Sequence, residues 1–318
     1  MELGLRPINR DDVDAIVALA EAVAAVDDPD SVVTRDHVAA QFDIPGIDIT
    51  RTVWVMPGDD GWLTASVAAV PLATESDETV HISCDVHPGH RGKGIEERLL
   101  RFAEAQAPRV RALPDMPGRL HAGIRAANRE RADLLERLGY SPVRWFLELE
   151  RGLDGELPDA AIPDGLSVAE ADGEIVMDDV FCALSESFKD HWHQASFTVE
   201  QYRHFYATMA DAPVTTLLAR DGCGEPAGVC IARVTAEKNA QRGTREGEIV
   251  VLGVRRPYRR RGLARALLAR CMHWLRDAGM QVATIGVDAD SPTGANLLYE
   301  SVGFTERRTA VVYHKPMA

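Results

Sequence analysis

Lysine is scarce in this chain of 318 residues, and no apolar run is long enough to cross a membrane. Lysine occurs only at Lys93, Lys189, Lys238 and Lys315, so arginine carries nearly all of the positive charge. Together with abundant alanine, this bias indicates a high-GC bacterial genome. The formal net charge of −14 argues against nucleic acid or an anionic membrane as a general partner. Charges interrupt the N-terminal segment, so we expect neither a signal peptide nor a membrane span.

Cysteines are few, odd in number and without the close spacing of a metal site. They are Cys84, Cys182, Cys223, Cys230 and Cys271. No disulfide framework is indicated, and we expect reduced thiols in the cytoplasm. His191 and His193 flank Trp192, but no third ligand follows at a recognisable spacing, so we expect no metal.

The most informative stretch is 248–270, EIVVLGVRRPYRRRGLARALLAR. It predicts an apolar strand over 249–252, a basic turn, and a helix that begins at about Gly262. At such a helix start several backbone N–H groups lack intrahelical partners and face the same way, with the positive end of the helix dipole behind them. Gly262 and Ala264 leave room for an anion to approach the backbone. The sequence therefore predicts a site for a phosphate or pyrophosphate.

The spacing Val254-x4-Arg259-x2-Gly262-x-Ala264, followed about 35 residues later by the segment 298–304, LYESVGF, resembles the acetyl-CoA motif of the GCN5-related N-acetyltransferases (GNAT). The resemblance implies acetyl-CoA as cosubstrate. It also implies cofactor contacts by Leu252, Gly253, Val254, Arg259, Arg260, Arg261, Gly262, Leu263, Ala264 and Arg265.

Two further positions match residues with chemical roles in the family, in which an amine attacks the thioester directly. Glu248 resembles the strand glutamate that accepts the amine proton, or it contacts the substrate. Tyr299 matches the tyrosine that donates a proton to the departing thiolate. One departure is Pro292, which stands where many members carry an asparagine that contacts the cofactor.

The predicted order of strands and helices occurs twice, which indicates a duplicated domain. We predict an N-terminal domain over 1–150, a linker over 151–164 and a catalytic C-terminal domain over 165–318. The expected fold class is α/β (α+β), with two tandem GNAT domains. Each would hold a mixed, mostly antiparallel twisted sheet flanked by helices. This arrangement of two domains is similar to that of the tandem acetyltransferases of actinobacteria.

The first copy lacks three residues that matter in the second. Glu96 takes the place of Ala264, and its bulk and charge oppose an anion at the turn. By counting along the motifs, Val80 stands at the place of Glu248 and Leu135 at that of Tyr299. We therefore expect a degenerate first domain. The alternative is that Arg91, Gly92, Gly94 and Asn128 still hold CoA without chemistry.

The sequence indicates less about the acceptor, the molecule that receives the acetyl group. At the end of the predicted helix 174–187, and in the segment between it and the predicted helix 198–209, Glu186 or Asp190 could hold a cation. Aromatic residues could form a wall, namely Phe188, Trp192, Tyr202 and Tyr206. The expected function is acetylation of a primary amine of a small molecule. The alternatives are acetylation of a cysteinyl amine and a non-catalytic CoA-binding sensor. The oligomeric state cannot be read from the sequence.

Overall fold

The computed structural model describes residues 3–58, 61–74, 77–113, 115–171, 174–193, 198–209 and 212–317. The chain forms two compact units. The first contains the residues up to Trp145 and those from Ala310 onward, and the second contains Phe146–Thr309.

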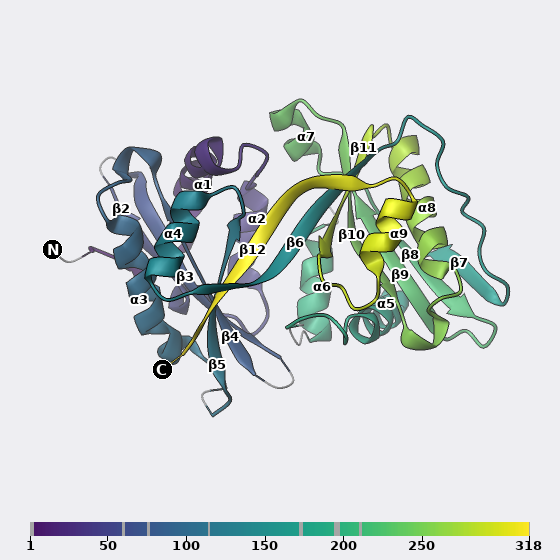
Figure 1. Cartoon of the computed structure of the whole chain (residues 1–318), viewed down its shortest axis with the longest axis horizontal. Coiled ribbons are helices and arrows are strands. Elements are labelled where there is room, and N and C mark those ends of the chain that lie inside the picture. Colours follow the sequence, from purple (N-terminus) through teal and green to yellow (C-terminus); the bar gives the residue numbers. More distant parts are fainter. Residues whose placement is uncertain are drawn as a thin grey trace. The chain divides into compact units, whose positions relative to one another are not determined.

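The first unit holds one mixed sheet with helices on both faces (Figure 1). Its strands are β1 (Arg6–Pro7), β2 (Val53–Pro57), β3 (Leu63–Ala73), β4 (Glu78–Val86), β5 (Gly118–Arg125) and the end of β12 (Thr305–Pro316). They follow the order β1-β2-β3-β4-β5-β12, and all neighbours are antiparallel except β4 and β5. The helices are α1 (Val13–Asp27), α2 (Arg35–Ala40), α3 (Ile95–Val110) and α4 (Arg129–Arg137). Apolar residues of α3 and α4 form one core cluster with the sheet, and α1 contributes to another.

The second unit repeats this architecture. Its strands are the end of β6 (Ser141–Gly152), β7 (Leu166–Glu170), β8 (Val214–Asp221), β9 (Pro226–Arg233), β10 (Glu246–Val254) and β11 (Val282–Asp288). The order is β6-β11-β10-β9-β8-β7, with β10 and β11 parallel and the other neighbours antiparallel. The helices are α5 (Glu174–Ser187), α6 (Val199–Ala207), α7 (Ala236–Arg242), α8 (Leu263–Asp277) and α9 (Ala295–Ser301).

β9 shows why the second sheet is covered on both faces. Its residues alternate between two apolar clusters. Cys230 and Ala232 pack with α8, whereas Val229 and Ile231 pack with α5 and α6. A strand that is buried on both sides needs apolar residues at consecutive positions, which explains the run AGVCIA.

The last strand of each repeat belongs to the other unit. β6 follows β5 along the chain but pairs with β11, over Phe146–Gly152. β12 follows β11 but pairs with β5, over Ala310–Pro316. The compact units are therefore divided at different residues from the predicted domains 1–150 and 165–318. Apolar residues of β6 alternate with polar ones, and those of β12 are consecutive over 310–313, so the sequence pattern alone fits either sheet.

The segment predicted as a linker, 151–164, includes part of the core of the second unit. Leu153 and Leu157 are buried among residues of α8 and β11. The N–H of Leu153 also donates to the carbonyl of Gln281 at 2.8 Å. Glycine and proline indicated an extended connection here, but the two leucines fix it to the sheet.

Several local predictions are confirmed, and one helix was missed. The predicted helices over 174–187 and 198–209 form as α5 and α6. A capping box begins α6, where Thr198 and Gln201 exchange side-chain and backbone hydrogen bonds. α7 was not predicted because its sequence, AEKNAQR, has no apolar periodicity. Among the described residues, no helix is both long and apolar enough to cross a membrane.

The packing of Leu153 gives a testable prediction. This side chain is 0% exposed, so Leu153→Ala removes buried methyl groups and leaves a cavity. We expect the free energy of unfolding to fall by about 2–5 kcal/mol in urea titrations followed by circular dichroism. Leu297→Ala is the matched control, because Leu297 is 71% exposed, and its effect should stay within about 0.5 kcal/mol. Equal effects of the two variants would show that 151–164 is a loose linker.

Candidate active site

The central feature of the second unit is the point where β10 and β11 part. Among the residues that the structure describes, β10 pairs with β11 only from Glu246 to Ile249, but it pairs with β9 as far as Val254. A register shift between Ile249 and Val251 places a bulge at Val250. Beyond it, one edge of β10 faces an opening instead of a strand, so its backbone groups are available to a ligand.

The turn that is predicted to bind an anion lies at the start of α8. The turn from Arg259 to Gly262 contains two residues with positive φ, Arg260 at 63° and Gly262 at 89°. Gly262 is the N-cap residue and supplies no side-chain hydrogen bond to the helix. The first N–H groups of α8 therefore have neither an intrahelical partner nor a cap, and the helix dipole favours an anion there. Arg260 and Arg265 are exposed beside this turn.

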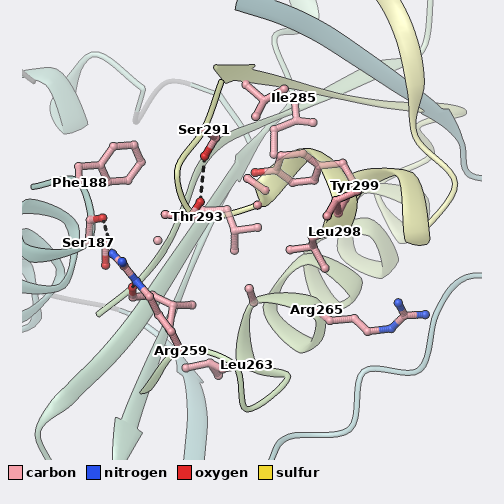
Figure 2. A pocket seen from close by; sticks show the side chains of 18 of the residues that line it. Ser187, Phe188, Arg259, Leu263, Arg265, Ile285, Ser291, Thr293, Leu298 and Tyr299 are labelled. Atoms are coloured by element: carbon pink, nitrogen blue, oxygen red, sulfur yellow. Dashed lines mark hydrogen bonds between the residues drawn. The ribbon is translucent and has the colours of Figure 1, made fainter. Parts of the chain in front are cut away.

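A cavity of about 500 Å³ joins the open strand edge to the helix start. Figure 2 shows Leu263 and Arg265 of α8, Leu298 and Tyr299 of α9, and Ser187 and Phe188 at the end of α5 around it. The predicted residues that line this cavity are Leu252, Gly253, Val254, Arg259, Arg260, Gly262, Leu263, Ala264, Arg265 and Tyr299. The residues that sequence spacing predicted thus come from a strand, a turn and two helices, and they line one cavity.

Tyr299, the predicted proton donor, lies in the wall of the cavity. Its side chain extends from α9 into the cavity wall and is only 5% exposed (Figure 2). Burial raises the pKa of Tyr299 above its ordinary value, and nearby Cys230 adds to the effect. The phenol is therefore protonated at neutral pH and has a proton to donate.

Asp190 lies beside the turn and not in the cavity wall. Its carboxylate accepts hydrogen bonds from Arg259 Nη1 at 2.7 Å and from Arg256 Nε at 3.0 Å, and Arg256 Nη2 contacts its other oxygen. Arg259 also donates to the carbonyls of Val254 and Ser187, at 2.9 and 3.1 Å. Asp190 thus orients Arg259, and its charge is already paired with two guanidinium groups. A substrate cation at Asp190 would have to share this carboxylate with both arginines.

The other predicted residues outside the cavity wall also have partners. Glu186 accepts from Arg255 Nε at 2.6 Å, so it too is part of an ion pair. Arg261 donates to the carbonyl of Asp164 at 3.0 Å. Trp192 contacts Phe146 of β6, with ring centroids 6.3 Å apart. In the predicted aromatic wall, Phe188 lines the cavity, but Tyr202 and Tyr206 pack in the core between α5, α6 and the sheet.

Glu248 lies on β10 before the bulge and does not line the cavity. Its Oε2 accepts from Arg233 Nε and Nη2, at 2.9 and 2.7 Å, and its side chain is 39% exposed. Ile249 packs toward α8, so Glu248 points to the other face of the sheet. It is reachable from solvent next to the point where the strands part.

The bulge also corrects a comparison between the two copies. The register of β3 with β4 runs without a shift, so β4 lacks the extra residue that Val250 adds to β10. Val80 and Ile82 pack toward α3, which places His81 on the opposite face. His81, and not Val80, therefore stands where Glu248 does. A gap-free count cannot detect a bulge.

Sequence reasoning missed the contribution of α5 to the cavity. Ser187 and His191 line it together with Phe188. Gly253 is the sequence feature that could have indicated this contribution, because a Cβ there would lie only 2.8 Å from Ser187 Cβ. Gly253 is predicted only as a cofactor contact, and the structure shows in addition that its missing side chain lets α5 approach. Ser291 and Thr293, which share a hydrogen bond of 2.9 Å, line the side near α9 (Figure 2).

An open strand edge that leads to an uncapped helix start, with a protonated tyrosine alongside, defines a class of proteins that bind an acyl-CoA and transfer its acyl group. In the described part of the chain, no group of three or more His, Cys, Asp or Glu side chains is arranged to hold a metal ion.

Comparison with known proteins gives the family. The model of the acetyltransferase (GNAT) family matches residues 177–304. Mycothiol acetyltransferase of Arthrobacter sp. (strain FB24) is 30% identical over 76% of this chain and 72% of its own length. Mycothiol acetyltransferase of Thermobispora bispora is 28% identical over 96% of both chains. The chain belongs to the acetyltransferase (GNAT) family and is an acyltransferase.

Solved structures agree on the fold. A GCN5-related N-acetyltransferase from Sphaerobacter thermophilus superposes with a TM-score of 0.72 at 25% identity, over 98% of this chain and 95% of that one. A tandem GNAT protein from the clavulanic acid biosynthesis pathway reaches a TM-score of 0.74 at 15% identity, over 99% and 98%. The predicted fold class, with tandem GNAT architecture, is confirmed.

The ion pairs of Asp190 generate the second prediction. Hydrogen bonds, from Arg256 first and Arg259 next, lower the pKa of Asp190 below its ordinary value. A carboxylate whose pKa is lower in the folded state stabilises the protein above its unfolded pKa of about 3.9, and this contribution is lost as the pH falls through the folded pKa. We expect Asp190→Asn to lower the free energy of unfolding by about 1 kcal/mol at pH 7, with a difference from wild type that narrows below about pH 4.

Asp133→Asn, at an exposed position of α4, is the control and should change stability little at any pH. If Asp190 instead held the substrate cation, Asp190→Asn would raise the KM of the acceptor while leaving the stability unchanged.

Proposed function

We propose that the chain moves an acetyl group from acetyl-CoA to a primary amine of a small molecule, and that the second unit performs the reaction. The observation that carries this proposal is the single cavity that contains the open edge of β10, the uncapped start of α8 and Tyr299. The first unit has Leu135, which is 0% exposed, at the position that aligns with Tyr299.

Features at both ends of the cavity support acetyl-CoA as its ligand. In our proposal the pyrophosphate accepts hydrogen bonds from the N–H groups of Leu263, Ala264 and Arg265, with Arg260 close by. Gly262 allows this approach, since its φ of 89° is strained for any residue with a Cβ. The amides of the pantetheine arm pair with the open edge of β10 between Val250 and Val254, as an added strand would.

The chemistry follows from where protons must go. The amine nitrogen attacks the thioester carbonyl carbon, the C–N bond forms, and the C–S bond breaks. Tyr299 donates its proton to the departing sulfur, whose thiol has a pKa of roughly 8.5. A backbone N–H on the open edge of β10 polarises the carbonyl. Glu248, paired with Arg233, accepts the proton that the amine loses, through water, or holds the amine before it reacts.

We place the acceptor on the face of the sheet that carries Glu248. β6 contributes Phe146, Glu148 and Glu150 to this face, because Leu147 and Leu149 pack toward α8 and α9 on the other. Charged pairs continue across it, with Arg308 donating to Glu148 at 2.6 and 2.7 Å. A polar face of this kind suits a small, hydrogen-bonding amine.

The names of the relatives favour one finer candidate. Mycothiol acetyltransferases at about 30% identity cover most of the chain. On this basis the acceptor would be a cysteinyl amine of a mycothiol precursor. The residues on the acceptor face are compatible with a polar compound. Acetylation assays with different amines would identify the acceptor.

The role of Tyr299 can be tested without knowing the acceptor. We expect Tyr299→Phe to slow the background hydrolysis of acetyl-CoA by about 100-fold or more, because it removes the proton donor. The Kd of acetyl-CoA should change less than about twofold, since the ring remains. Release of the free thiol, followed with a colorimetric thiol reagent, measures the rate.

Tyr313→Phe is the matched control. Tyr313 is also buried and donates to Glu136 at 3.3 Å, but it lies in the first unit. Its removal should leave hydrolysis unchanged. Unchanged hydrolysis in Tyr299→Phe would mean that the chain binds acyl-CoA without catalysing its reaction through this residue.

A further inference from the structure

The first unit retains the turn of an acyl-CoA site. Arg91 Nε donates to the carbonyl of Val86 at 3.2 Å, as Arg259 does to that of Val254. Arg91 is also held by Asp27 through two hydrogen bonds of 2.7 and 2.8 Å, the arrangement that Asp190 provides in the second unit. Gly92 and Gly94 have φ of 74° and 70°, so the backbone follows the same path into α3.

The first unit also retains the parting of two parallel strands. β4 pairs with β5 only from Glu78 to His81, but with β3 as far as Val86. Cys84 therefore lies on the part of β4 that β5 does not pair. The motif comparison aligns Cys84 with Leu252, which lines the cavity of the second unit.

Arg131 fills this place in the first unit. Its side chain extends from α4 and donates to the carbonyl oxygen of Cys84 at 2.6 Å and to the sulfur of Cys84 at 2.9 Å. The residue that aligns with Arg131 in the second unit is Ala295, which lines the open cavity. Asn128, expected as a possible cofactor contact, instead caps α4 by accepting from the N–H of Arg131 at 3.1 Å.

We infer that the first unit contains a second acyl-CoA cleft that its own Arg131 keeps closed. The guanidinium occupies a backbone acceptor on the strand edge that a pantetheine arm would use. Expelling it would break two hydrogen bonds and leave the carbonyl of Cys84 to be satisfied anew. Glu96, in place of Ala264, adds repulsion where the pyrophosphate would bind. The identity of the ligand rests on the proposed use of acetyl-CoA by the second unit.

Opening the cleft requires both obstacles to be removed, so the test uses Glu96→Ala alone and combined with Arg131→Ala. We expect calorimetric titration with CoA to show about one site per chain in wild type and in Glu96→Ala. About two sites are expected in the double variant. Adding Gly94→Glu to the double variant should return it to one site, which assigns the new site to the first unit. Glu96→Ala with Arg129→Ala is the control, because Arg129 is an exposed arginine of α4, and it should retain one site.

Two sites in wild type or in Glu96→Ala would overturn the inference, as would one site in a folded double variant. Arg131→Met, which keeps the aliphatic part of the side chain, replaces Arg131→Ala if thermal unfolding shows that the alanine variant is not folded. A wild type without any CoA site would instead contradict the proposed function of the second unit.

Discussion

The account depends on one feature of strand pairing, the parting of β10 from β11 after Ile249. A parallel pair that continued to Val254 would satisfy every backbone group of the sheet internally and leave no place for a ligand. The bulge at Val250 and the turn that follows β10 place an open strand edge beside an uncapped helix start. Interactions around the cavity preserve this arrangement. Arg259 joins Val254, Ser187 and Asp190, and so connects the strand, α5 and the turn.

Duplication explains the architecture, and divergence explains the difference between the units. Both units have five antiparallel or parallel pairings in the same order, and each receives its last strand from the other repeat. The exchange places Phe146 of β6 against Trp192, so a residue that precedes the second repeat in sequence contributes to the face on which we place the acceptor. The first unit retains the turn and the parted strands. It differs at three positions: Glu96 repels an anion, Arg131 fills the cleft, and Leu135 stands where the second unit has Tyr299.

Features that depend on local sequence could be predicted, and those that depend on three-dimensional packing could not. The start of α8 was predictable because the anion site needs Gly262 and Ala264 at fixed spacing. Tyr299 could be predicted because the segment 298–304 matches the second half of the family motif. The arginine partners of Asp190 and Glu186 could not be predicted, because the sequence does not show which of the many arginines lies within hydrogen-bonding distance. The bulge at Val250 was hidden because residues 249–252 form a continuous apolar run, in which an extra residue leaves no visible break. The strand exchange was hidden because the apolar pattern of β6 and β12 fits either sheet.

The most direct test of the central claim is calorimetric binding of acetyl-CoA to wild type, Gly262→Glu and Gly94→Glu. Both substitutions place a carboxylate at a left-handed glycine that starts a helix, at φ of 89° and 70°, so each strains the backbone at the same position of its turn. The account predicts one site in wild type that is lost in Gly262→Glu and retained in Gly94→Glu. Loss of binding in Gly94→Glu alone would contradict it, because the working cleft would then lie in the first unit.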